Sequence, residues 1–115
     1  MPQPKRGEIW LVRFPFTDLT STKLRPALVL AIHGEDAIVM GIFSRIPPGT
    51  LMKTWVLIED HHPAFRHTGL KKSSLLKAEK IALINCTVFH RKLGVLPPEI
   101  MAQAQEALKK ALLIS

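Results

Sequence analysis

The sequence is poor in several features that mark common classes of protein. Its single cysteine, Cys86, excludes an intrachain disulfide and a zinc site of the CxxC type. The longest apolar runs, PALVLAI and AIVMGIF, are much shorter than the roughly 18 residues of a membrane-spanning helix. The opening residues, MPQPKRG, lack the apolar core of a secretory signal peptide. We therefore expect a soluble protein of the cytoplasm that binds no membrane.

Aromatic and acidic residues are also scarce. Tyrosine is absent, and nine acidic residues stand against 16 lysines and arginines, which gives a net charge of +7. Such an excess of positive charge favours a polyanionic partner, most simply nucleic acid, although a solvated basic surface would have the same composition. The apolar share of 47% is enough for one hydrophobic core, so we expect one domain over residues 1–115.

Five segments have the apolar pattern of β-strands. They cover residues 7–14, 26–32, 37–44, 54–59 and part of 73–84. In the first segment, Trp10 and Val12 alternate with Ile9 and Leu11, which is typical of a strand with two different faces. The proline that opens the second segment can only stand at its start, because proline has no N–H for the ladder. The stretch FPFTDLTSTKLRPALVL places a long polar loop between the first two strands.

The end of the chain has a helical pattern. LPPEIMAQAQEALKKALLIS (residues 96–115) begins with prolines and a glutamate, which is a typical helix start. One apolar stripe at helical spacing consists of Ile100, Ala104, Ala107, Leu108, Ala111 and Leu112. Glu99 near the start and Lys109 and Lys110 near the end suit the helix macrodipole.

The segment between the last predicted strand and this helix is harder to assign. For CTVFHRKLG (residues 86–94) we predict a second short helix, closed by Gly94. Trp10 and Trp55 fall within predicted strands and are expected in the core. The expected fold class is therefore mainly β, a small antiparallel barrel or curled sheet with a C-terminal helix packed on it.

Several motifs follow one another in a fixed order. Gly7-Glu8 opens the first strand, Phe14 to Asp18 lead into the long loop, and Arg25-Pro26 opens a buried apolar strand. Ser44 ends the third strand, and the last third of the chain continues with a strand, a connection and a terminal helix. This arrangement resembles the MazF/PemK family of toxin endoribonucleases over nearly the whole chain.

The resemblance implies a fold, an activity and partners. It implies an SH3-like barrel that forms a homodimer and binds single-stranded RNA along a basic groove. It also implies an mRNA interferase of a type II toxin–antitoxin system, which cuts RNA at short sequences without a metal or other cofactor. A cognate antitoxin would hold the toxin inactive and bind DNA together with it. The residues that match the catalytic positions of the family are Arg25 and Ser44.

The chemistry of metal-free RNA cleavage suits these two residue types. The 2′-OH attacks the adjacent phosphorus, which requires a base, stabilisation of the phosphorane oxygens, and an acid for the leaving 5′-oxygen. The planar guanidinium of Arg25 matches phosphate oxygens. It remains protonated at neutral pH, so it is a poor base. Ser44 can donate a hydrogen bond to a non-bridging oxygen.

Further residues are candidates for contacts with RNA. The hydroxyls and the cation of the long loop can reach phosphates and base edges, and the arginine after Ser44 can reach a phosphate. The predicted RNA-binding residues are Thr17, Ser21, Thr22, Lys23 and Arg45. Other basic residues lie in three separate segments, and we interpret them as general surface rather than as one patch. They are Lys71, Lys72, Lys77, Lys80, Arg91 and Lys92.

Other hypotheses remain open at this point. His61, His62 and His67 lie in one segment and could in principle serve in catalysis or hold a metal, although no cysteine completes a typical ligand set. Cys86 follows an apolar run and is expected as a small packed hydrophobe rather than a nucleophile. A non-catalytic, basic SH3-like module that binds nucleic acid or antitoxin is the main alternative, and a degenerate toxin that only binds antitoxin is another.

Overall fold

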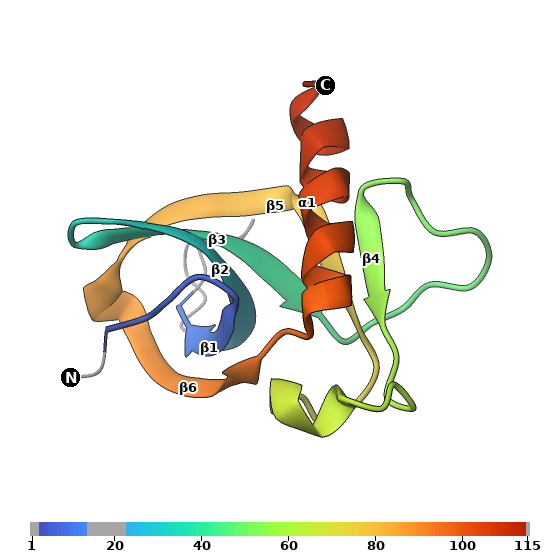
Figure 1. Cartoon of the computed structure of the whole chain (residues 1–115), viewed down its shortest axis with the longest axis horizontal. Coiled ribbons are helices and arrows are strands. Elements are labelled where there is room, and N and C mark those ends of the chain that lie inside the picture. The colour runs from blue at the N-terminus through green and yellow to red at the C-terminus, as the bar shows by residue number, and fades with distance from the viewer. Residues whose placement is uncertain (1–2, 14–22, 115) are drawn as a thin grey trace.

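The computed structural model describes residues 3–13 and 23–114 of the chain (Figure 1). In these ranges, six β-strands, two short 3-10 helices and one α-helix follow one another. They are β1 (Glu8–Val12), β2 (Arg25–His33), β3 (Asp36–Phe43), β4 (Trp55–Ile58), η1 (Phe65–Thr68), β5 (Ser74–Asn85), η2 (Cys86–Val88), β6 (Phe89–Val95) and α1 (Pro98–Leu112).

The six strands form one curled sheet in the order β4-β5-β3-β2-β1-β6, and every neighbouring pair is antiparallel (Figure 1). The predicted mainly β fold with a C-terminal helix is therefore confirmed. All five predicted strands are present, with the first one described over Glu8–Val12. The closure of this sheet into an SH3-like barrel stays a prediction.

The short helix predicted for residues 86–94 is wrong. Only Cys86–Val88 forms a 3-10 turn, in which the Asn85 side chain accepts a hydrogen bond from the Thr87 N–H. The rest of the segment is β6, because Phe89 packs edge-on against the Trp10 ring at 5.6 Å between centroids and the strand pairs with β1. Burial against a residue far away in the sequence overrides the local helical pattern.

β5 contains three residues with helical propensity, Ala78 to Lys80, and the sheet accommodates them as a bulge. Met40 pairs with Ile81, and the next residue, Gly41, pairs with Lys77. The intervening residues therefore have no partner on β3. The Ala78 N–H instead donates to the Thr54 carbonyl at 2.9 Å, just before β4.

The core lies on both faces of the sheet. On the face that α1 covers, the side chains include Ile9, Leu28 and Ile100, and on the other face they include Trp10 and Val12. This division confirms the alternation predicted for β1 and the core position of Trp10. Trp55 is only partly buried, so its expected place in the core is wrong; it lies on the edge strand β4, and its indole N–H donates to Glu79 at 2.8 Å.

The helix α1 packs its predicted apolar stripe against β4 and β5 (Figure 1). Ile100, Ala104 and Ala107 are buried there, while Leu112 at the last turn is exposed. Small alanines allow the helix to approach the sheet closely. None of the helices in the two described ranges is both long and apolar enough to span a membrane.

Candidate active site at one end of the sheet

The antiparallel order brings three chain segments to the same end of the sheet. β2 begins at Arg25, which pairs with Val12 at the end of β1. At the end of β3, Phe43 pairs with Leu75 at the start of β5. The chain therefore leaves β3 at Ser44 beside the point where it enters β5, and both points lie at the end of the sheet where β2 begins.

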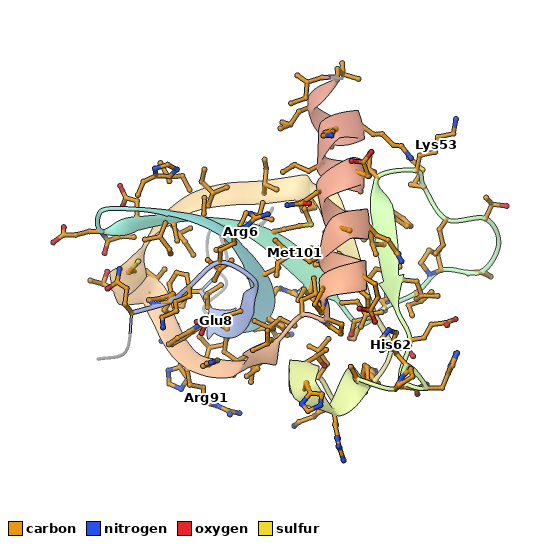
Figure 2. All side chains as sticks on the ribbon, in the orientation of Figure 1. Arg6, Glu8, Lys53, His62, Arg91 and Met101 are labelled. Atoms are coloured by element: carbon orange, nitrogen blue, oxygen red, sulfur yellow. The ribbon has the colours of Figure 1, made fainter. Side chains whose placement is uncertain are left out.

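β6 adds a fourth segment to this end. Leu11 on β1 pairs with Arg91 on one side and with Pro26 on the other. Directly paired residues point to the same face of a sheet. Arg91, Leu11 and Pro26 thus lie in one row across three strands, with Arg25 next to Pro26, although more than 60 residues separate Arg91 from Pro26 in the sequence. Arg91 projects from β6 at the lower margin of Figure 2.

These segments enclose a pocket of about 450 Å³. Its apolar lining consists of Leu11, Leu24, Pro26, Ile42, Leu70 and Leu93, together with Gly69. Its polar lining consists of Arg25, Ser44, Lys71, Lys72, Ser74 and Arg91. Ligand pockets in proteins usually measure about 300–1,000 Å³, so this one has room for a nucleotide. Among the described residues that line it, four are cations and none is a carboxylate or an imidazole.

The pocket unites the two residues that the family resemblance implies as catalytic. Arg25 at the start of β2 and Ser44 after β3 both line it. Of the predicted RNA-binding residues, Lys23 and Arg45 are exposed neighbours of lining residues but do not line the pocket themselves. The other three, Thr17, Ser21 and Thr22, lie outside the described residues. Their roles stay predictions.

Sequence reasoning missed three residues of the pocket. The interpretation of Lys71, Lys72 and Arg91 as general surface is wrong, since all three line the pocket beside Arg25. The pairing of residues 89–95 with β1 was the missing information, because it alone brings Arg91 to this end. Lys77 and Lys92 do lie elsewhere: Lys77 lies 4.5 Å from the centre of the Trp55 ring, and Lys92 pairs with Glu8.

Glu8 joins β1 to β6 at the start of β1. Its carboxylate accepts a hydrogen bond from the Trp10 indole at 2.9 Å and forms an ion pair with Lys92 at 3.0 Å. Burial raises the pKa of Glu8, but hydrogen bonds from Trp10 and Lys92 outweigh burial and hold that pKa below its ordinary value. Lys92 thus supports the sheet, whereas its neighbour Arg91 lines the pocket.

The histidines form a separate group that does not reach the pocket. His61 contacts Glu59 at 2.9 Å. His62, which is labelled in Figure 2, contacts Glu99 in the first turn of α1 at 2.8 Å. His62 also accepts a hydrogen bond from the Ala64 N–H through Nδ1, so its Nε2 carries the proton shared with Glu99. Within residues 3–13 and 23–114, no three metal-ligating side chains are clustered so as to hold a metal ion.

Cys86 lies at the other end of β5. It packs against the core on the face of the sheet opposite α1. Burial, and next the nearby carboxylates of Asp36 and Glu35, raise the pKa of the Cys86 thiol. A raised pKa lowers the share of reactive thiolate at neutral pH, in agreement with the packing role expected for this residue.

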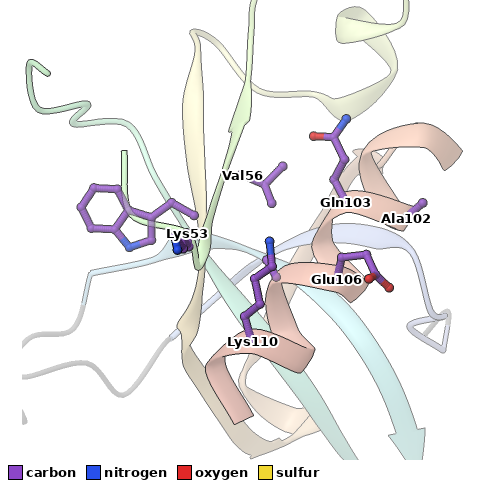
Figure 3. A pocket seen from close by; sticks show the side chains of 8 residues that line it. Lys53, Val56, Ala102, Gln103, Glu106 and Lys110 are labelled. Atoms are coloured by element: carbon purple, nitrogen blue, oxygen red, sulfur yellow. The ribbon is translucent and has the colours of Figure 1, made fainter. Parts of the chain in front are cut away.

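A second pocket, of about 370 Å³, lies between β4 and α1 (Figure 3). Trp55 and Val56 line it from β4, and Ala107 lines it from α1. Two lysines and one glutamate form its charged lining. Neither Arg25 nor Ser44 reaches it, so we place the candidate active site at the first pocket.

Comparison with known proteins gives a family and a fold. The family described as PemK-like, MazF-like toxin of type II toxin-antitoxin system matches residues 5–112. The Mycobacterium tuberculosis toxin MazF-mt6 superposes with a TM-score of 0.73 at 18% identity, over 94% of this chain and 98% of that one. A mycobacterial endoribonuclease, in complex with its cognate antitoxin, superposes with a TM-score of 0.72 at 19% identity over 98% of each chain. MazF from Deinococcus radiodurans superposes with a TM-score of 0.71 at 19% identity, over 96% of this chain and 97% of that one.

The two kinds of likeness carry different weight. No curated protein sequence gave a match, and identities below 20% in the superpositions show the fold alone. The family match extends over almost the whole chain and confirms the resemblance seen in the sequence. The chain therefore belongs to the PemK-like, MazF-like toxins of type II toxin–antitoxin systems.

Proposed function

We propose that the protein is an endoribonuclease that cuts single-stranded RNA at the first pocket without a metal ion. The observation that carries this proposal is the convergence of Arg25 and Ser44, from the start of β2 and the end of β3, in one basic pocket. A pocket lined by cations and hydroxyls suits a phosphodiester. Membership of a toxin family and folds shared with MazF toxins support the same activity.

The reaction is a transesterification within the RNA. The 2′-oxygen forms a bond to the adjacent phosphorus, and the bond from phosphorus to the 5′-oxygen breaks. The 2′-OH loses its proton and the 5′-oxygen gains one, which leaves a 2′,3′-cyclic phosphate and a 5′-OH. In this scheme, Arg25 stabilises the negative charge that builds up on the phosphorane, and Ser44 donates a hydrogen bond to a non-bridging oxygen.

The base that accepts the proton of the 2′-OH is not found in the described lining. Arg25 is a poor base because its guanidinium stays protonated, and none of the described lining residues is a carboxylate or an imidazole. General-base catalysis typically contributes about 10²–10⁴-fold to a rate. We therefore expect a slow enzyme that relies mainly on electrostatic stabilisation.

Further contacts and partners complete the proposal. Thr17, Ser21 and Thr22, together with Lys23 and Arg45, would contact RNA on either side of the cleaved bond. We also propose that the protein forms a homodimer in the cytoplasm and is held inactive by a cognate antitoxin. A mycobacterial endoribonuclease that shares the fold is known in complex with its cognate antitoxin, and the Deinococcus radiodurans MazF, which also shares the fold, is known as a MazE-MazF structure.

The activity can be tested with two matched RNAs that differ at one atom. We would first map the cleavage site on a long single-stranded RNA in the presence of EDTA. A short RNA with this site, and the same RNA with a single 2′-deoxy substitution at the cleaved nucleotide, would then be compared. We expect the first to give a 2′,3′-cyclic phosphate and a 5′-OH, and the second to stay intact because it lacks the nucleophile.

Two other outcomes would overturn the proposed reaction. Cleavage of the 2′-deoxy substrate at the same bond would show that the nucleophile is water. Tight binding of the RNA with no cleavage at any enzyme concentration would favour the alternative, a non-catalytic module. The lack of a base in the described lining of the pocket is the observation that keeps this alternative in view.

A further inference from the structure

We propose that Lys71, Lys72 and Arg91 form a second phosphate site, which binds the RNA phosphate next to the one that is cleaved. This inference rests on the proposed function and extends it to substrate recognition. Arg25 and Ser44 would hold the reacting phosphate, and the three other cations would hold its neighbour along the chain. All five side chains line the same pocket.

The number of charges in the pocket favours two phosphates over one. A phosphodiester carries one negative charge, whereas Lys71, Lys72 and Arg91 alone bring three positive charges to a space of about 450 Å³. Like charges that lie close together repel each other unless an anion lies between them. One phosphate would leave most of this charge uncompensated, so the pocket suits at least two consecutive phosphates.

Lys71, Lys72 and Arg91 have no acidic partner among the described residues. Elsewhere, lysines do have acidic partners, such as Lys92 with Glu8 at 3.0 Å and Lys109 with Glu106 at 3.2 Å. The three cations of the pocket are thus available to an external anion.

The turn that carries the two lysines is held at both ends. Before it, the fully buried Thr68 donates a hydrogen bond to the Phe65 carbonyl at 2.7 Å and accepts one from the Leu70 N–H at 3.1 Å. After it, the Ser74 hydroxyl donates to the Lys72 carbonyl at 2.9 Å. These bonds fix the backbone at Lys71 and Lys72 and leave only their side chains to be ordered by a ligand.

Two glycines allow the backbone of this turn and of η1 before it to contact β6 directly. Gly69 has a φ of +74°, and a Cβ there would lie 2.1 Å from the Leu93 carbonyl oxygen. A Cβ on Gly94 would lie 2.1 Å from the His67 carbonyl oxygen. The two backbones therefore touch with no side chain between them. This contact holds the lysine turn beside the strand that carries Arg91. The backbone of Lys71 and Lys72 therefore has a fixed position relative to that of Arg91.

The proposal is tested with the double variant Lys71→Ala/Lys72→Ala and the single variant Arg91→Ala. The matched control is Lys109→Ala/Lys110→Ala, which removes an equal charge from the exposed side of α1. Affinity would be measured by titration of a short RNA that carries one 2′-deoxy substitution at the cleaved position, so that binding is observed without cleavage. Lys71 and Lys72 are exposed, so we expect an unchanged thermal midpoint.

We expect the double variant to bind this RNA about tenfold more weakly than the control variant. The slope of log affinity against log salt should become shallower by about 0.7, the value for one phosphate on a single strand. A neutral methylphosphonate at the neighbouring phosphate should weaken binding to the unaltered protein by a similar factor, but should hardly affect the double variant.

The outcomes separate this inference from the proposed function. Equal affinity and equal salt slope in the double variant and the control would overturn the second phosphate site, even if the protein cuts RNA. A loss of affinity confined to the double variant and Arg91→Ala would support the site; if no cleavage is ever seen, the unsubstituted RNA serves for the same titration. A methylphosphonate effect that is undiminished in the double variant would also contradict the proposal.

Discussion

At the scale of single residues, the hydroxyl after β3 has a defined task in the proposed reaction. Ser44 lines the pocket with Arg25 and is exposed to an incoming ligand. A hydrogen bond from its hydroxyl to a phosphate oxygen strengthens as negative charge builds up on that oxygen. In the proposed reaction, the side chain would therefore contribute to the rate rather than to the fold.

We expect Ser44→Ala to lower the rate of RNA cleavage roughly tenfold, because one hydrogen bond to a charged group is lost. Ser44→Thr keeps the hydroxyl and should retain most of the activity. Single-turnover cleavage of one RNA by both variants would measure the difference. Equal rates in Ser44→Ala and the unaltered protein would remove Ser44 from the mechanism.

Glu8 gives a prediction for stability at low pH. Because its pKa in the folded protein lies below the ordinary 4.5, its ionised form stabilises the fold at pH values above 4.5, and this contribution is lost as the pH falls through the lower value. Glu8→Gln removes the effect, which we expect to be about 1 kcal/mol at pH 7.

Urea unfolding of both proteins between pH 3 and pH 7 would measure this difference. The gap in the free energy of unfolding should be largest at pH 7 and should narrow toward pH 3. A gap that stays constant over this range would mean that the charge of Glu8 does not stabilise the fold.

At the scale of elements, the site depends on how β6 is placed between β1 and η1. Gly94 lies where the strand touches the backbone of His67. Its φ lies outside the positive range, so an alanine there would be destabilising only because its Cβ would clash with the His67 carbonyl oxygen. Gly34, in the turn between β2 and β3, has a φ of +63° and open space around it. An alanine there would be destabilising only because of backbone strain.

These two glycines allow a matched test of the backbone contact. We expect Gly94→Ala to reduce the free energy of unfolding by about 2–3 kcal/mol, because β6 and η1 must move apart. Gly34→Ala should cost about 1 kcal/mol. Chemical denaturation would measure both, and a smaller cost for Gly94→Ala than for Gly34→Ala would contradict the close packing described here.

The same elements show what the sequence could predict. The strands and the terminal helix were predictable because their apolar residues repeat with the period of each element, as at Ile100 and Ala104 in α1. β6 was not predictable in this way, because the burial of Phe89 depends on Trp10, which lies far away in the sequence. Arg25 and Ser44 were identified through the family pattern, whereas the position of Arg91 required the strand order itself.

At the scale of the whole molecule, the net charge of +7 is distributed unevenly over the fold. Part of it is concentrated at one end of the sheet, where β2 and β5 begin, and part is paired within the fold, as with Lys92 and Glu8. Concentrated charge attracts a polyanion and makes its binding sensitive to salt. The basic composition therefore includes a local cluster of cations as well as a solvated surface.

If two phosphates are held in the pocket, log KM for RNA should rise with log salt with a slope of about 1.4. A fourfold increase in salt would then raise KM about sevenfold. kcat should hardly change, because the saturated complex already has its phosphates in place. Steady-state cleavage at several salt concentrations would measure both constants, and a KM independent of salt would contradict binding through the basic pocket.

The most direct test of the central claim is the rate of RNA cleavage by Arg25→Ala beside that of Arg66→Ala. Arg66 is an exposed arginine of η1 that does not line the pocket, so its variant controls for loss of one charge. Loss of one group that stabilises the transition state typically lowers a rate by about 10²–10³. We predict this loss for Arg25→Ala under single-turnover conditions, with Arg66→Ala unchanged. Cleavage by Arg25→Ala at the rate of the unaltered protein would contradict the account.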